Sequence, residues 1–198
     1  MQHAVHARVI SYPVHGSASP QLLQSDLMKF FYLLLFALSL SVISCQSASR
    51  VVQHDADLRT DLFAQVSALE GRWQGEAAEG PMQVTEFSVT SGGSVVREIM
   101  MPGEPYEMTN MYSLDGNSLL MTHYCAIGNQ PRMRATSSTD GRMVFESEGV
   151  SDLKSSDDLY MGSMTLVIKD ADHAEQHWTS FKNGEVDSEM IIKLTRVQ

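Results

Sequence analysis

From residue 72 onward, apolar and polar residues alternate in short runs, which is the pattern of β-strands with one buried face. Each run is bounded by glycine, proline, asparagine or aspartate, the residues that favour turns. The pattern predicts about ten strands, at residues 72–78, 82–90, 94–101, 106–114, 117–125, 131–138, 142–149, 161–169, 175–182 and 185–197. The dipeptides most typical of tight hairpin turns are Asp115-Gly116, Asp140-Gly141 and Asn183-Gly184.

A helical period is found just before these strands. Four apolar residues recur there at helical spacing: Leu58, Leu62, Val66 and Leu69. Gly71 follows them as a helix terminator. Since the strands follow one another through short hairpins, the pattern favours an all-β fold: an antiparallel up-and-down barrel with a short N-terminal helix. Closing the sheet into a barrel removes the exposed strand edges that an open sheet would leave.

The segment from Met28 to Cys45 has the features of a secretory signal. Lys29 precedes an apolar run from Phe30 to Ile43, which is shorter than the ~20 residues of a membrane-spanning helix. The last four residues, Val-Ile-Ser-Cys, resemble a bacterial lipobox, in which Cys45 becomes the lipidated N-terminus. The alternative is an ordinary secretory signal cleaved a few residues later. Gln46, in place of an aspartate, favours an outer-membrane lipoprotein facing the periplasm.

These features divide the chain into four parts. Residues 1–27 lack periodicity and precede the charged start of the signal, so we expect a non-native upstream extension, or else a long n-region. Residues 28–44 are the expected lipoprotein signal peptide. Residues 45–56 are a polar tether, and residues 57–198 are the barrel domain.

Charge and cysteine content restrict the possible functions. Removing residues 1–44 reduces the 14 basic and 24 acidic residues to 12 and 23, a net charge of −11. This acidic balance argues against nucleic-acid binding, which needs basic surface. Once Cys45 is acylated, Cys125 is the one remaining thiol, so no internal disulfide can form, and we expect Cys125 to be buried.

Hairpin geometry predicts which residues share the barrel interior. A two-residue turn at Asp115-Gly116 would pair Asn110 with Met121, and the next hairpin would pair Cys125 with Pro131. The predicted inner face is apolar and rich in methionine; its residues are Tyr106, Met108, Asn110, Tyr112, Leu119, Met121, His123, Cys125 and Met133. Trp178, on a later strand, is added to this interior.

His123 and Cys125 thus lie two residues apart on one strand face, which allows three interpretations. Both could be structural or ligand-contacting residues, with His123 bonded to Asn110 or to a tyrosine. They could bind a metal, although zinc requires three or four ligands. They could form a nucleophilic dyad, although the sequence offers no orienting group or oxyanion hole.

A resemblance to known families supports the barrel. Gly71 and Trp73 look like the glycine-x-tryptophan that opens the first lipocalin strand, and Arg196 looks like the arginine that packs across that tryptophan. THYCAIGNQPRM, SGGSVVRE and MYSLDG resemble a bacterial lipocalin-like family described as a domain of unknown function, over residues 65–197. This resemblance to the calycin superfamily implies a fold but supplies no activity.

The expected function is binding of a small apolar ligand inside a lipid-anchored envelope barrel, without catalysis or cofactor. A haem- or metal-binding barrel is one alternative, since Gly71-x-Trp73-x-Gly75 looks like the start of nitrobindin-type haem barrels. Ala77 departs from that pattern where a further glycine would stand. The other alternative is a structural envelope protein whose barrel is filled by side chains.

Overall fold

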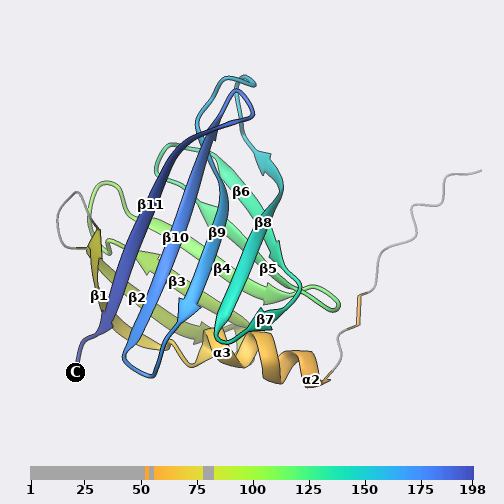
Figure 1. Cartoon of the computed structure of the whole chain (residues 1–198), viewed down its shortest axis with the longest axis vertical. Coiled ribbons are helices and arrows are strands. Elements are labelled where there is room, and N and C mark those ends of the chain that lie inside the picture. Colours follow the sequence, from red (N-terminus) through yellow and green to blue (C-terminus); the bar gives the residue numbers. More distant parts are fainter. Residues whose placement is uncertain (1–51, 54–55, 78–82) are drawn as a thin grey trace, which may run out of the picture. The chain divides into compact units, whose positions relative to one another are not determined.

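Antiparallel strands dominate the computed structural model of the chain (Figure 1). It describes residues 52–53, 56–77 and 83–198, and these belong to a compact unit, Val51–Gln198. The predicted extension, the signal segment and Cys45 lie outside the described residues. Among the helices that are described, none is long and apolar enough to span a membrane.

The strands close into the predicted barrel. Their order is β6-β5-β4-β3-β2-β1-β11-β10-β9-β8-β7, and an additional β6–β8 pairing joins the two sides of a ten-stranded barrel. The bounds are β1 Gly71–Ala77, β2 Gln83–Thr90, β3 Val95–Met100, β4 Met108–Leu114, β5 Leu119–Tyr124, β6 Gln130–Ala135, β7 Ser138–Thr139, β8 Arg142–Ser151, β9 Tyr160–Ile168, β10 His173–Lys182 and β11 Glu185–Arg196. The expected strand at 131–138 is therefore divided between β6 and the two-residue β7.

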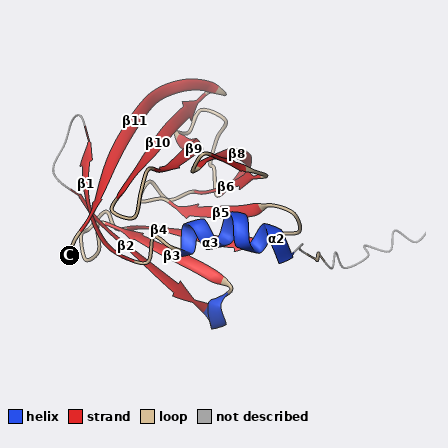
Figure 2. Ribbon diagram, turned by 60° about the horizontal axis from the view of Figure 1, so that its bottom comes forward, coloured by secondary structure: helices blue, strands red, loops and turns tan. Residues whose placement is uncertain are grey.

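A short helical segment precedes β1 and lies against one end of the barrel (Figure 2). It consists of α2 (Ala56–Leu58), the π-helical turn η2 (Arg59–Phe63) and α3 (Ala64–Ser67). Leu62, Val66 and Leu69, from the predicted apolar face, are buried against the core. We call this the helix end of the barrel. The hairpin end is the opposite one, formed by the connections 101–107, 125–129, 152–159 and 183–184.

Two of the three predicted tight turns form as expected. Asn183-Gly184 and Asp140-Gly141 have positive φ at both residues, which is the requirement of a type I′ hairpin. Asp115-Gly116 instead belongs to a four-residue loop, in which Asp115 N–H donates to Ser118 C=O and Leu114 pairs with Leu119.

Because this loop has four residues instead of two, the observed pairing of β4 with β5 differs from the predicted pairing. Asn110 pairs with His123 rather than with Met121, and in the next hairpin Met121 pairs with Met133. Both shifts are two residues, so the expected inner and outer faces of β4, β5 and β6 are unchanged. The predicted interior residues within β4, β5 and β6 therefore keep their face despite the error in the predicted pairing.

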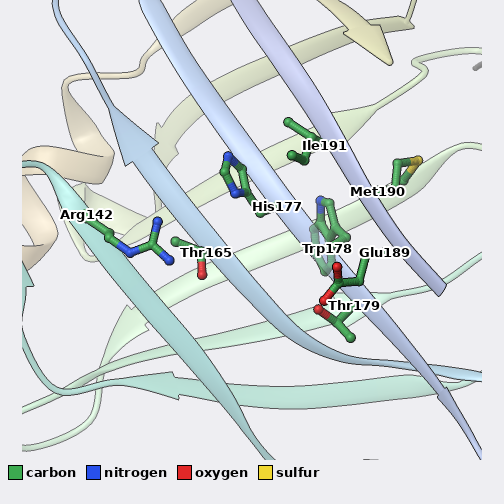
Figure 3. Close-up of a pocket in the computed structure, with 8 residues that line it drawn as sticks. All are labelled: Arg142, Thr165, His177, Trp178, Thr179, Glu189, Met190 and Ile191. Carbon is green, nitrogen blue, oxygen red and sulfur yellow. The ribbon is translucent and has the colours of Figure 1, made fainter. Parts of the chain in front are cut away.

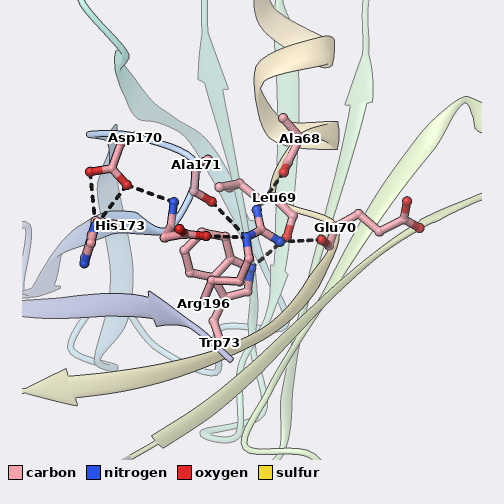
Figure 4. Close-up of polar contacts among 9 residues, drawn as sticks. Ala68, Leu69, Glu70, Trp73, Asp170, Ala171, His173 and Arg196 are labelled. Carbon is pink, nitrogen blue, oxygen red and sulfur yellow. Dashed lines mark hydrogen bonds and ion pairs between the residues drawn. The ribbon is translucent and has the colours of Figure 1, made fainter. Parts of the chain in front are cut away.

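Trp73 and Arg196 close the helix end, as the resemblance implied (Figure 4). They are paired residues of β1 and β11, and the Arg196 guanidinium carbon lies 4.2 Å from the indole centroid. The guanidinium also donates to three backbone carbonyls, those of Ala68, Glu70 and Ala171. A Cβ at Gly71, whose φ is 129°, would lie 2.9 Å from Arg196 Nη1, so a glycine suits this contact.

Candidate functional site

Polar residues from neighbouring strands meet in the middle of the barrel. Glu98 on β3 pairs with Asn110 on β4, and Asn110 pairs with His123 on β5. All three side chains point inward, and none is more than 2% exposed. They form a polar row across three strands, and Gln176 on β10 approaches the row from the opposite wall.

Glu98 is the centre of this network. One carboxylate oxygen accepts hydrogen bonds from Asn110 Nδ2 and Tyr112 Oη, each at 2.7 Å. The other accepts from Gln176 Nε2 at 2.6 Å, and Gln176 Oε1 in turn accepts from Trp178 Nε1 at 3.2 Å. The protein itself therefore supplies a donor to both carboxylate oxygens.

Burial changes the proton affinities of this network. Desolvation raises the pKa of the Glu98 carboxyl, although the hydrogen bonds from Asn110, Tyr112 and Gln176 act in the opposite direction. Desolvation, together with the charge of Glu98, raises the pKa of the Tyr112 phenol. Tyr112 is therefore a neutral donor at physiological pH.

The network also determines the tautomer of His123. Because Asn110 Nδ2 donates to Glu98, its Oδ1 faces the imidazole, 2.6 Å from His123 Nδ1. A carbonyl oxygen accepts hydrogen bonds and cannot donate them, so Nδ1 must carry the proton. Burial lowers the pKa of His123 to about 4, so the ring is neutral and Nε2 keeps its lone pair.

That lone pair is open. No described residue hydrogen-bonds to His123 Nε2, whose ring is 2% exposed. Asn129 Oδ1 is the one side-chain nitrogen or oxygen in the described chain that is both fully buried and without a partner. Nε2 therefore remains accessible to a water-sized molecule, beside the Trp178 ring at a centroid distance of 4.9 Å.

Sulfur-containing side chains form the adjacent row, nearer the hairpin end. Met100 pairs with Met108, and the Cys125 thiol donates to Met108 Sδ at 4.0 Å. Cys125, which was expected to be buried, is only partly buried, because it starts the β5–β6 turn just beyond the end of β5. Desolvation raises the pKa of its thiol, which makes it a poor nucleophile at neutral pH.

The predicted ligand-binding residues separate into three groups by depth. Asn110, Tyr112, Met121 and Met133 are 0% exposed, so no water-sized space touches them. Met108, His123, Cys125 and Trp178 keep some accessible surface. Contact with a ligand is therefore possible without rearrangement only in this second group.

Tyr106 alone forms the third group, and its predicted place in the interior is wrong. It is 48% exposed and lies in the 101–107 connection. The expected strand included it because the alternation of residues continues through 106–114. The chain turns at residues 101–107, however, and β4 begins at Met108.

Glu98 and Gln176, which hold the network together, were not predicted from the sequence. Each occupies an inward position between buried apolar residues, Val96 and Met100 for Glu98, and Ala174 and Trp178 for Gln176. A carboxylate or amide within an otherwise apolar strand face is the signal that could have identified both, since buried polar groups need partners.

A groove of about 780 Å³ is lined by residues of β8–β11 (Figure 3). Of the predicted ligand-binding residues, Trp178 alone lines it; the other lining residues are Arg142, Thr165, His177, Thr179, Glu189, Met190 and Ile191. His177 and Glu189 belong to the outer face of these strands, opposite the buried Gln176 and Ile192. His177 Nε2 bonds to Glu175 at 2.9 Å, so its partly buried imidazole already has a partner.

The surroundings of His123 do not fit a haem. The Trp178 ring already packs against the His123 ring, with centroids 4.9 Å apart and ring planes inclined by 47°. Core side chains around this level, such as Tyr112 and Met164, have no accessible surface. Within the described residues there is also no group of three or more His, Cys, Asp or Glu side chains placed to hold a metal ion. The open Nε2 suits a smaller ligand.

Comparison with known proteins supports the fold alone. No family model and no curated protein matches the chain. Among solved structures it is similar to Rv2717c from M. tuberculosis, at 12% identity and a TM-score of 0.51, over 74% of this chain and 100% of that one. A DUF3598-family protein of unknown function from Nostoc punctiforme matches at 17% identity and a TM-score of 0.44, over 67% of this chain and about half (49%) of that one.

Proposed function

We propose that this protein is a lipid-anchored protein of the bacterial cell envelope, facing the periplasm from the outer membrane, that binds a small apolar molecule without catalysing a reaction. The ligand enters from the hairpin end and donates a hydrogen bond to His123 Nε2. Its apolar part packs against Trp178 and Met108.

The observation that carries the proposal is the open Nε2 in a network that is otherwise satisfied. Glu98, Asn110, Tyr112, Gln176 and Trp178 all find their hydrogen-bond partners within the protein. Nε2 is left for a donor from outside the protein, and a bound hydroxyl or N–H group would take the place of water there.

The depth of the network restricts the ligand to small molecules. Because core side chains such as Tyr112, Met121 and Met164 are 0% exposed, the ligand occupies the level of Met108 and Cys125. Methionine side chains adapt their shape, so Met100 and Met108 can enlarge this space at low cost. The ligand would be comparable in size to a single aromatic ring.

Native mass spectrometry of the protein purified from its own membranes tests this function. The proposal predicts a bound molecule beyond the mass of the acylated chain. His123→Phe, which removes the acceptor but keeps an aromatic ring beside Trp178, should lose that molecule. Wild-type protein with no added mass, or an unchanged adduct in His123→Phe, would contradict the proposal.

A structural role is the second candidate, and the close-packed interior favours it. Tyr112, Met121, Phe145, Met164 and other large side chains from several strands are fully buried, as in a barrel filled by its own residues. In that case the protein would carry no ligand, and His123→Phe would change its stability alone. The same mass spectra separate the two functions.

A further inference from the structure

Exposed apolar side chains gather on and beside the connections of the hairpin end. Four of them are between 38% and 53% exposed, and we call them the apolar rim: Tyr106, Tyr124, Ile127 and Leu159. We propose that the apolar rim is the docking surface for a second protein, whose own surface presents an apolar centre surrounded by basic side chains. This goes beyond the proposed function, which involves no second protein, and it rests on the proposed lipid anchor for the direction in which the rim faces.

Two contacts bring together the connections that carry the apolar rim. The Cys125 thiol, in the β5–β6 turn, lies 4.0 Å from Sδ of Met108, the residue that directly follows the β3–β4 connection. Asn129, at the end of the same turn, donates from Nδ2 to the Leu159 carbonyl at 2.8 Å. The β5–β6 turn therefore adjoins both of the other connections. Exposed apolar residues that are grouped in this way mark an interaction site, whereas single ones do not.

The residue types of the rim are those of a protein interface. Two of its four side chains are tyrosines, and tyrosine is enriched in the centres of protein–protein interfaces, where it contributes much of the binding free energy. Isoleucine and leucine add apolar surface without a polar group to desolvate. The rim therefore has the composition of an interface centre, which a polar border would complete.

Carboxylates supply that border and select the partner. In the three connections 101–107, 125–129 and 152–159, Lys154 is the one basic residue, against five acidic residues: Glu104, Glu107, Asp152, Asp157 and Asp158. Basic side chains around an apolar centre would complement this charge. A second copy of this chain would bring carboxylates opposite carboxylates, and an anionic lipid surface would be repelled in the same way.

The start of the described chain lies at the opposite end of the barrel. Val52 adjoins Gly116, in the β4–β5 connection at the helix end, since a Cβ on Gly116 would be 2.7 Å from Val52 Cγ1. Cys45 precedes Val52 by seven residues, which span at most about 25 Å. A membrane that holds an acylated Cys45 would therefore adjoin the helix end, and the apolar rim would face away from it, towards soluble proteins.

Site-specific photocrosslinking of the full, acylated chain in its own cells tests the docking surface. Benzoylphenylalanine, a photoreactive amino acid, replaces Ile127, whose side chain is 53% exposed in the β5–β6 turn. The matched control places it at Val144, which is 43% exposed near the other end of the barrel, at the start of β8. We expect a covalent adduct with a basic protein from the Ile127 position and none from the Val144 position.

Charge reversal then tests the complementarity, with the purified protein that the adduct identifies. Calorimetric titration should show association at least about tenfold weaker for the double variant Glu104→Lys/Asp157→Lys than for the parent, and weaker association of the parent at high salt. Ile127→Ser should also weaken the association, whereas Val144→Ser should leave it unchanged.

Several outcomes would overturn the docking surface. They are adducts with a second copy or with lipid alone, no adduct, equal yields from the two positions, and an affinity that charge reversal leaves unchanged. Native mass spectra test the proposed function separately. Spectra without a bound molecule, together with a basic protein captured from the Ile127 position and released by charge reversal, would refute the proposed function and support the docking surface.

Discussion

His123 donates from Nδ1 to Asn110 Oδ1 across 2.6 Å, and this bond decides which nitrogen of the ring is left open. Asn110 cannot turn its amide around, because its Nδ2 is held by the Glu98 carboxylate at 2.7 Å. The buried Glu98, acting through Asn110, therefore determines which nitrogen of His123 is left as a hydrogen-bond acceptor.

The buried imidazole makes stability depend on pH. The pKa of His123 is lowered from 6.5 to about 4, so the unfolded chain binds a proton more readily than the folded one. Stability due to the neutral ring should be complete above pH 6.5 and lost as the pH falls towards 4, by on the order of 3 kcal/mol.

The measurement is the unfolding free energy of wild type minus that of His123→Gln, recorded against pH by chemical denaturation. The raised pKa of Glu98 acts in the opposite sense above pH 4.5, but it is common to both proteins and cancels in the difference. A difference that stays flat between pH 6.5 and 4 would show that His123 is not buried as a neutral ring.

Replacement of Glu98 should destabilise the barrel in proportion to the number of buried donors that lose their acceptor. Glu98→Leu leaves Asn110 Nδ2, Tyr112 Oη and Gln176 Nε2 without their acceptor, at about 1–3 kcal/mol for each buried donor. Glu98→Gln keeps one carbonyl oxygen and should cost less. Urea unfolding of both variants checks the order, and equal stability of Glu98→Leu and wild type would refute the network.

Trp73 and Arg196 should differ strongly in their effect on stability. Trp73 is fully buried and its Nε1 donates to Leu69 C=O at 2.7 Å, so Trp73→Ala should cost about 3–5 kcal/mol. Arg196→Lys keeps the charge but cannot reach all three carbonyls, and should cost about 1–3 kcal/mol. Thermal unfolding of the two variants gives the comparison; a larger loss in Arg196→Lys would contradict this ranking.

The lipid anchor can be tested by one substitution. Cys45→Ser should move the protein from the membrane fraction to the soluble fraction, because a serine cannot be acylated at a lipobox. Intact mass before and after the substitution supplies the control. Membrane association of Cys45→Ser with an unchanged mature mass would rule out the anchor.

The sequence was informative where local chemistry decides the structure. Alternation and turn residues predicted the strands and the barrel, and Asn183-Gly184 formed its expected turn. The Asp115-Gly116 turn was mispredicted because the same dipeptide also fits a longer loop, in which Ser118 closes the hydrogen bond. The interior faces survived because the resulting shift was an even number of residues.

The polar network could not be predicted from local patterns. Glu98 and Gln176 are separated by 78 residues and meet only when the barrel closes. Alternation placed His123 and Asn110 on one face, but the tautomer of His123 depends on Glu98, a partner on another strand. The residues on the wall of the site could therefore be predicted from the sequence, but Glu98, which orients Asn110 and through it His123, could not.

His123 Nε2, as an open acceptor, should take a hydrogen bond from a small ligand that carries a donor. Nitrogen-15 NMR of the His123 ring, with and without phenol, measures this bond, with anisole as the matched probe that lacks a donor. We expect an unprotonated Nε2 whose signal shifts with phenol, and binding of anisole at least about tenfold weaker, the value of one hydrogen bond. A protonated Nε2, or equal shifts with phenol and anisole, would show that this nitrogen is not an open acceptor.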